Sequence, residues 1–326
     1  MTALPRKFAI ARAAMGPPAT PRFASLFVTR RCNLACSYCR SIRQGFTDMD
    51  LDSWRLAIDR LYGFGCRVFS LTGGEPLIRS DIIDIVRHIT QKRKAVCWMI
   101  SNFGLMKKST IDALAEAGMQ FITCSLDSLQ GHGEKSSSDA IELLSYAKSR
   151  GMIASTLTVI TRENIDEVPF VMAHVQRRGI IFDMGLYQHV GGLFSPNITT
   201  CKVTDMAALE KLRKQMRSSK IRTGLVSPSW SYLTHDLSAY LDSSWKCSAE
   251  KDRFLVVNNN GTMMACQEHD TGVSIFNVET LDDSRWRAEK SRAVNACRGC
   301  FYGCYFQKER IGVLDALLDA WTMMRA

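Results

Sequence analysis

The chain has no long apolar run. None of its 326 residues belongs to an apolar stretch of the roughly 18 positions that a membrane-spanning helix needs. The basic segment 1–21, rich in alanine and proline, also lacks the continuous apolar core of a signal peptide. We therefore expect residues 1–22 to be a flexible lead-in, on a cytoplasmic protein with no membrane partner. No sequence repeat is evident either, which argues against a repeat array.

Histidine is scarce, with six in the chain. Only His189 and His269 follow segments of functional interest, and an ordinary surface or core role is favoured for both. The formal net charge of +10 would suit an anionic substrate or a nucleic acid. The basic residues are scattered along the sequence, however, so a nucleic-acid partner is not expected.

Cysteine is abundant by contrast, with twelve in the chain. In a large chain without an export signal, such a number favours metal ligation over disulfides. Cys32, Cys36 and Cys39 have the spacing C-x3-C-x2-C. Three thiolates on one loop can hold three corners of a cubic iron–sulfur cluster and leave the fourth iron open. An open position is typical of catalytic metal sites, whereas reduced core thiols are the competing interpretation.

Strands and helices alternate after this loop. The pattern predicts strands over residues 24–29, 67–71, 95–100, 121–126, 153–160 and 180–186, with a helix between each pair. Six β/α units in series imply an α/β fold with a parallel sheet curled into a partial (β/α)6 barrel of the TIM type. We expect this core to span residues 23–190.

A different organisation is expected beyond the barrel. Residues 191–245 read as a linker or lid segment, and residues 246–326 as a small, cysteine-rich α+β domain ending in an amphipathic helix. Within that domain, residues 254–257 and 262–266 flank an Asn-Gly pair, which predicts a β-hairpin.

Polar residues follow the predicted strands at their C-terminal ends, where parallel α/β folds carry active sites. Gly73 and Gly74 would let a ligand approach bare backbone, and Glu75, which precedes Pro76, offers a carboxylate to an ammonium group. A tight strand–helix turn is the alternative reading. Six further candidates follow the later strands: Ser101, Asn102, Ser125, Asp127, Thr158 and Arg162. Because strand side chains alternate, Ser125 and Asp127 would point into the barrel and Cys124 outward.

The three-cysteine loop after the first strand and Gly-Gly-Glu-Pro after the second together resemble the signatures of the radical S-adenosylmethionine (SAM) superfamily, over residues 23–188. The resemblance implies that Cys32, Cys36 and Cys39 hold a [4Fe-4S] cluster, whose free iron binds the amino and carboxylate groups of SAM. Tyr38 would then pack near the adenine, and residues 73–75 would face the methionine amino group. Ser101 and Ser125 would contact the SAM carboxylate or ribose. Residues 101–104 are similar to the family's Thr-Asn-Gly turn, with Phe103 as an insertion.

The same resemblance implies a chemistry. An electron, supplied by a reducing partner of flavodoxin or ferredoxin type, would cleave SAM to methionine and a 5′-deoxyadenosyl radical that abstracts hydrogen from the substrate.

A second group of cysteines lies near the C-terminus: Cys247, Cys266, Cys297, Cys300 and Cys304. A hairpin cysteine followed by C-x2-C resembles the SPASM/twitch extension, which carries auxiliary iron–sulfur clusters. Five cysteines fit one auxiliary [4Fe-4S] cluster of the twitch type, and a structural zinc site is the alternative. One cluster needs at most four ligands, so Cys247 or Cys304 could be a spare thiol. A spare thiol could donate hydrogen in an epimerisation, whereas a fully ligated cluster would favour dehydrogenation.

The expected activity is hydrogen abstraction from a small polar metabolite, such as a sugar, aminocyclitol or nucleoside of natural-product biosynthesis, by an oxidoreductase or epimerase. Only about two dozen residues precede the first strand, too few for the peptide-recognition domain that many peptide-modifying relatives carry. The alternatives are a peptide- or protein-modifying enzyme and a non-catalytic iron–sulfur or zinc protein. The sequence predicts neither the substrate itself nor the oligomeric state.

Overall fold

The computed structural model describes residues 21–39, 47–129, 135, 139–189, 200–304, 317–318, 321–322 and 325. In this part of the chain the strands form one nine-stranded sheet, in the order β6-β5-β4-β3-β2-β1-β7-β8-β9. The first six strands are β1 (Phe23–Thr29), β2 (Val68–Gly73), β3 (Val96–Ser101), β4 (Phe121–Ser125), β5 (Ile153–Ile160) and β6 (Ile181–Leu186). Each is parallel to its neighbour. The predicted α/β fold with a partial parallel barrel is confirmed.

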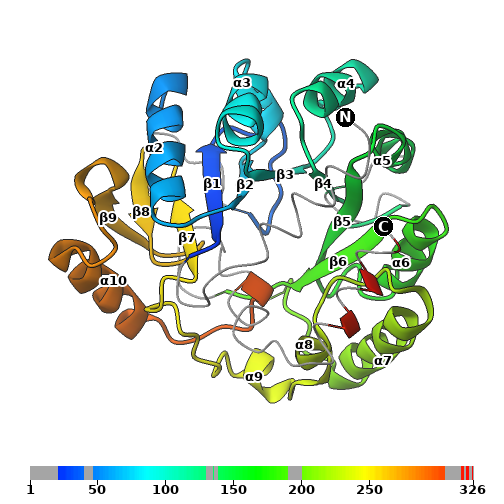
Figure 1. Ribbon diagram of the computed structural model, residues 1–326. Helices are drawn as coiled ribbons and strands as arrows, with labels where there is room; N and C mark the ends of the chain where they lie inside the picture. Colours follow the sequence, from blue (N-terminus) through cyan, green and yellow to red (C-terminus); the bar gives the residue numbers. More distant parts are fainter. Residues whose placement is uncertain are drawn as a thin grey trace.

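The crossover helices lie on the outer side of the curved sheet (Figure 1). They are α2 (Leu51–Gly63), α3 (Ile82–Arg87), α4 (Lys108–Glu116), α5 (Ala140–Ser149) and α6 (Val168–Gln176). A short turn, η1 (Pro76–Ile78), precedes α3, and a π-helical turn, η2 (His88–Lys92), extends it. In α2, Trp54, Ala57, Ile58 and Leu61 are the buried residues, and this helical spacing forms one apolar stripe against the sheet. Such packing fixes the strand ends that carry the site.

The C-terminal strands extend the barrel sheet beyond β1. β7 (Phe254–Val257) runs parallel to β1, and β8 (Thr262–Met264) and β9 (Asp270–Ser274) follow antiparallel. The predicted β7–β8 hairpin is confirmed, with Gly261 in the left-handed region at φ +84°. Helix α10 (Ser284–Ala296), which packs on β9, was not predicted, and neither was β9.

Residues 200–253 contain helices α7 (Met206–Thr223), α8 (Trp230–Thr234) and α9 (Ser238–Leu241), and a turn, η3 (Ile275–Asn277), follows β9. The predicted lead-in and most of the predicted C-terminal helix lie outside the described residues. Among the helices that the structure does describe, none is long and apolar enough to cross a membrane.

Candidate active site

The three N-terminal cysteines face one cavity at the C-terminal edge of the parallel strands. Cys32, Cys36 and Cys39 line this cavity, which has a volume of about 240 Å³. The Cys39 amide donates to the Cys36 carbonyl at 3.0 Å and so closes a turn. The Cys32 Sγ accepts hydrogen bonds from the Leu34 amide at 3.4 Å and from Asn102 Nδ2 at 3.6 Å. Such N–H donors suit a sulfur atom that carries negative charge.

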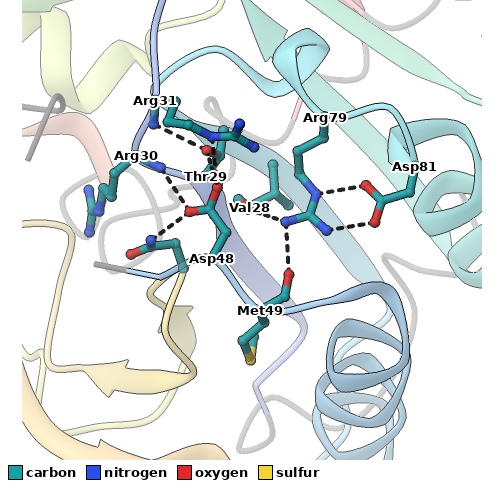
Figure 2. Close-up of polar contacts among 9 residues, drawn as sticks. Val28, Thr29, Arg30, Arg31, Asp48, Met49, Arg79 and Asp81 are labelled. Carbon is teal, nitrogen blue, oxygen red and sulfur yellow. Dashed lines mark hydrogen bonds and ion pairs between the residues drawn. The ribbon is translucent and has the colours of Figure 1, made fainter. Parts of the chain in front are cut away.

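Asp48 ties the two ends of the cysteine loop together (Figure 2). Its carboxylate accepts from Thr29 Oγ1 at 2.6 Å and from Arg31 Nε at 3.3 Å, on the strand side of the loop. It also accepts from Asn259 Nδ2 at 2.7 Å, in the β7–β8 turn. Burial alone would raise the pKa of Asp48, but these hydrogen bonds and Arg31 hold it below its ordinary value. The carboxylate is therefore ionised at neutral pH and joins three segments.

Arg79 makes a second tie between the same ends. Its guanidinium donates to the Val28 carbonyl at 3.1 Å and to the Met49 carbonyl at 2.9 Å. Asp81 holds the guanidinium in place through an ion pair at 2.7 Å. We call Asp48 and Arg79 the loop clasp, because together they close the chain around the three cysteines (Figure 2).

The paired glycines at the end of β2, Gly73 and Gly74, let the backbone of the cysteine loop approach closely. A Cβ atom on Gly74 would lie 2.0 Å from the Arg31 carbonyl oxygen, and one on Gly73 would lie 2.2 Å from that of Thr29. Gly73 also has φ +137°, a conformation that side chains disfavour. The Gly74 amide donates to the Thr29 carbonyl at 2.8 Å. Both glycines line the cavity as well, so their predicted contact with SAM remains compatible with this packing.

Glu75 is fully buried and holds the end of β3. Its carboxylate accepts from Ser101 Oγ at 2.9 Å, from the Asn102 amide at 2.7 Å and from the Leu77 amide at 3.1 Å. Burial raises the pKa of Glu75 although these hydrogen bonds oppose the shift. Pro76 starts the turn that follows. The contacts predicted between SAM and Glu75 or Ser101 stay predictions, and the structure adds that these two side chains bind each other.

The end of β4 places a polar group beside the cysteine loop. Ser125 lines the cavity, and Cys124 is fully buried on the other side of the strand, as the alternation predicts. Asp127 accepts from the Tyr38 hydroxyl and, at 2.9 Å, from the Val159 amide. Burial and the Asp127 carboxylate raise the pKa of Tyr38, so its phenol is neutral.

The last predicted candidates do not line the cavity described here. The Thr158 hydroxyl donates to the Leu126 carbonyl at 2.7 Å and is buried. Arg162 is exposed. His269 lies beside the second cysteine group rather than at the barrel mouth.

Four of the five C-terminal cysteines line a second, smaller cavity of about 30 Å³: Cys247, Cys266, Cys297 and Cys300. A hydrogen bond with His269 lowers the pKa of the Cys297 thiol. Cys304 does not line this cavity but is close enough to Cys266 and Cys300 to raise the pKa of both, in addition to the larger effect of burial. Among the described residues, no three His, Cys, Asp or Glu side chains are placed to hold a single metal ion.

Among the residues of the first cavity, sequence reasoning missed Lys135, Gln267 and Glu268. Lys135 lines it, with its ammonium 5.2 Å from the centre of the Tyr38 ring. Burial alone would lower the pKa of Lys135, but Asp127 and the cysteine thiolates raise it. Gln267 and Glu268, from the β8–β9 connection, line the same cavity. Their place directly after Cys266 was the one available signal.

A parallel α/β barrel that presents three cysteines on the loop after its first strand, with a cysteine-rich extension, defines a class of iron–sulfur proteins. Residues 26–175 match the model of the radical SAM superfamily, so the chain carries a radical SAM domain. Proteins of this superfamily use a [4Fe-4S] cluster and SAM, the cofactors expected from the sequence. The C-terminal cysteine-rich region is consistent with a SPASM/twitch domain.

Similar proteins agree on the domain and differ in what they act on. The chain is 34% identical over 164 residues to a GTP 3′,8-cyclase of Chlorobaculum tepidum, covering 46% of this chain and 48% of that protein. It is 23% identical over 167 residues to a PqqA peptide cyclase of Rhodopseudomonas palustris, covering 47% and 43%. The chain thus spans about half the length of the curated relatives it matches.

Solved structures show the same fold. Streptococcus suis SuiB bound to S-adenosylmethionine is similar with a TM-score of 0.64 and 18% identity, over 84% of this chain and 68% of that one. The anSMEcpe structure with bound AdoMet is similar with a TM-score of 0.60 and 14% identity, over 94% and 95%.

Proposed function

We propose that this protein is a radical SAM enzyme that abstracts a hydrogen atom from a small polar metabolite, with oxidation or epimerisation as the outcome. The observation that carries the proposal is the cavity that Cys32, Cys36 and Cys39 share with Gly73 and Gly74. Three sulfur donors on one turn, with N–H groups directed at Cys32, have the chemistry that a cluster with one open iron requires. When bound, that cluster would supply the electron that splits SAM into methionine and a 5′-deoxyadenosyl radical.

The other groups of the cavity would bind and orient SAM. Lys135 is the cation on the cysteine-loop side and would attract the SAM carboxylate. Ser125 offers a hydroxyl from the neighbouring strand end. Tyr38, held by Asp127, would present a fixed ring to the adenine.

Replacing Cys32, Cys36 and Cys39 together with alanine is the direct test. The triple variant is expected to lose about four iron atoms per chain and all formation of 5′-deoxyadenosine, because no ligand remains for the cluster. Iron, visible absorbance and 5′-deoxyadenosine would be measured after anaerobic reconstitution with dithionite and SAM. A variant with alanine at the buried core thiols Cys66 and Cys97 is the matched control. It should keep its iron and its formation of 5′-deoxyadenosine. Unchanged iron in the triple variant would refute the proposal.

We propose further that Cys247, Cys266, Cys297 and Cys300 hold the auxiliary [4Fe-4S] cluster and that Cys304 is the spare thiol. The first four share one cavity, whereas Cys304 lies close to it without lining it. Replacing Cys304 with alanine should then leave the iron content unchanged, while replacing Cys247 should remove about four atoms per chain. Equal iron loss in both variants would show that Cys304 is a ligand.

The fate of a substrate radical follows from this assignment. A Cys304 thiol that gives its hydrogen atom to the substrate radical becomes a thiyl radical, which one electron from the external reductant and one proton from solvent must restore. Product that takes up solvent deuterium would indicate this route and epimerisation. A two-electron oxidised product would indicate electron transfer to the auxiliary cluster and dehydrogenation.

A peptide-modifying activity is the second candidate. The similarity to a PqqA peptide cyclase, and to SuiB, which has been crystallised with its precursor peptide SuiA, favours it. Hydrogen abstraction from an added peptide, with no turnover of small polar metabolites, would support the peptide-modifying activity over the first proposal.

A further inference from the structure

Two segments that lie far apart in the sequence line the first cavity. The cysteine loop contributes Cys32, Cys36 and Cys39, and the β8–β9 connection contributes Gln267 and Glu268. They meet because β7 pairs with β1, which brings the C-terminal strands beside the barrel (Figure 1). A ligand in this cavity therefore meets two segments whose relative position is set by the contacts between them.

Asn258 makes such a contact. It follows β7 directly and is fully buried. Its Oδ1 atom accepts a hydrogen bond from Nη2 of Arg30, which precedes Cys32 by two positions. Its Nδ2 atom donates to Asp270 Oδ2 at 2.9 Å. One side chain thus links the base of the cysteine loop to the first residue of β9.

Asp270 lies at the base of the connection that carries the second segment. It pairs with Met264 across the β8–β9 ladder. The Ala265 amide then donates to the His269 carbonyl at 2.8 Å and closes the connection. Residues 266–268 are therefore the tip of a short, hydrogen-bonded loop, and a shift of its base moves the tip with it.

The chemistry of the two partners fixes the orientation of the Asn258 amide. A guanidinium only donates and a carboxylate only accepts, so Oδ1 faces Arg30 and Nδ2 faces Asp270. The Asn259 amide adds a second donor to Oδ1 at 2.9 Å. Arg30 is 2% exposed, and its guanidinium carbon lies 4.5 Å from the centre of the Phe27 ring. Because Asn258 and Arg30 are shielded from water, solvent does not compete for their hydrogen bond.

From this arrangement, and resting on the proposed function, we infer that Asn258 is a positioning residue for SAM. It sets the distance between the cysteine loop and residues 267–268, so the groups of both segments are in place before SAM binds. Binding to a preformed cavity avoids the entropy cost of ordering two separate segments. Loss of the link between residues 258 and 270 therefore weakens SAM binding, although all the cysteines remain.

The test reverses the direction of the hydrogen bond between residues 258 and 270. In Asn258→Asp two carboxylates face each other, and in Asp270→Asn two amide groups do. Each single variant is expected to bind SAM about tenfold more weakly, because the cavity is no longer preorganised. In the double variant the new amide donates to the new carboxylate, which still accepts from Arg30. SAM affinity should then return to within about twofold of its original value.

Equilibrium dialysis with labelled SAM measures this affinity on the anaerobically reconstituted chain, and iron content and melting temperature are recorded for each variant. Asn260→Asp is the matched control, because it makes the same chemical change in the same turn. Its oxygen can still accept from the Thr262 hydroxyl, as Asn260 Oδ1 does at 2.9 Å, so SAM affinity should not change. If a single variant loads less iron, iron content becomes the quantity that the double variant must restore.

The outcomes separate this inference from the proposed function. Unchanged SAM affinity in both single variants, even with a lower melting temperature, would show that Asn258 has a structural role only. A double variant as weak as the single ones, or an equal loss in Asn260→Asp, would show that the link is not the cause. Each of these results overturns the inference and leaves the function standing. If the unmodified protein binds no SAM and forms no 5′-deoxyadenosine, the function fails and the inference fails with it.

Discussion

Replacing Gly74 with alanine is expected to destroy the proposed cluster site of Cys32, Cys36 and Cys39. The added methyl carbon would lie 2.0 Å from the Arg31 carbonyl oxygen and 2.8 Å from that of Arg30. Both are backbone atoms at the base of the cysteine loop, so a side-chain rotation cannot relieve the overlap. Overpacking of this kind costs about 1–3 kcal/mol and shifts the backbone that it meets. Because that backbone carries Cys32 one residue later, the thiol would move out of register with Cys36 and Cys39.

The measurement pairs iron content with thermal stability. Gly74→Ala should lose about four iron atoms per chain while retaining the auxiliary cluster, since the second cysteine group lies in its own cavity. Gly63→Ala is the matched control, because a Cβ there meets nothing within 4 Å and Gly63 ends a helix. That variant should be equally stable or more so. A Gly74→Ala protein with full iron and unchanged melting temperature would contradict the packing argument.

The first six strands could be predicted because each leaves a local signal. An apolar run of strand length followed by an amphipathic helix repeats along residues 24–186, and Gly118, Gly151 and Gly179 mark the ends of three of these helices. Strand β5 has the predicted bounds Ile153–Ile160. The cysteine loop was predictable for the same reason, since its spacing is local. The Asn-Gly turn before Thr262 likewise encodes the β7–β8 hairpin on its own.

What could not be predicted depends on contacts between distant segments. The parallel pairing of β7 with β1 joins residues 254–257 to residues 23–26, and nothing in either segment encodes that partner. Helix α10 buries only Trp286 and Lys290, too few apolar positions for a helical pattern. Glu268 therefore looked like an ordinary acidic residue until the sheet order placed it at the barrel mouth.

The packing role of the paired glycines, Gly73 and Gly74, also could not be predicted from the sequence. In the sequence they indicate a place where a ligand meets backbone. In the fold, the loop that follows β1 makes the closest approach to them, so the glycines and the cysteines depend on each other. A motif at the end of β2 thus supports the cysteine loop that follows the neighbouring strand, and it also lines the cavity.

The loop clasp leads to the second large expected effect. Replacing Asp48 with alanine removes the acceptor shared by Thr29, Arg31 and Asn259. Hydrogen bonds to a charged group are worth about 1.5–3 kcal/mol each when buried, and Asn259, which is fully buried, would lose its partner. We expect a loss of about 3 kcal/mol in the free energy of unfolding, together with iron loss at the first site, because the two ends of the cysteine loop would no longer be joined to each other or to the β7–β8 turn.

Arg31→Ala separates this effect from a simple loss of charge pairing. The Arg31 side chain is 65% exposed, and an exposed ion pair at 3.3 Å contributes at most about 1 kcal/mol. That variant should keep its iron and most of its stability. Asp48→Asn, which keeps one oxygen acceptor, should fall between the two.

The reduction potential of the first cluster in Asp48→Asn, measured by redox titration followed by electron paramagnetic resonance, distinguishes positioning from mere stability. A clasp that orients the cysteine loop changes this potential, whereas a remote structural contact leaves it unchanged. If Asp48→Ala and Arg31→Ala behave alike in iron, stability and potential, Asp48 does not hold the loop.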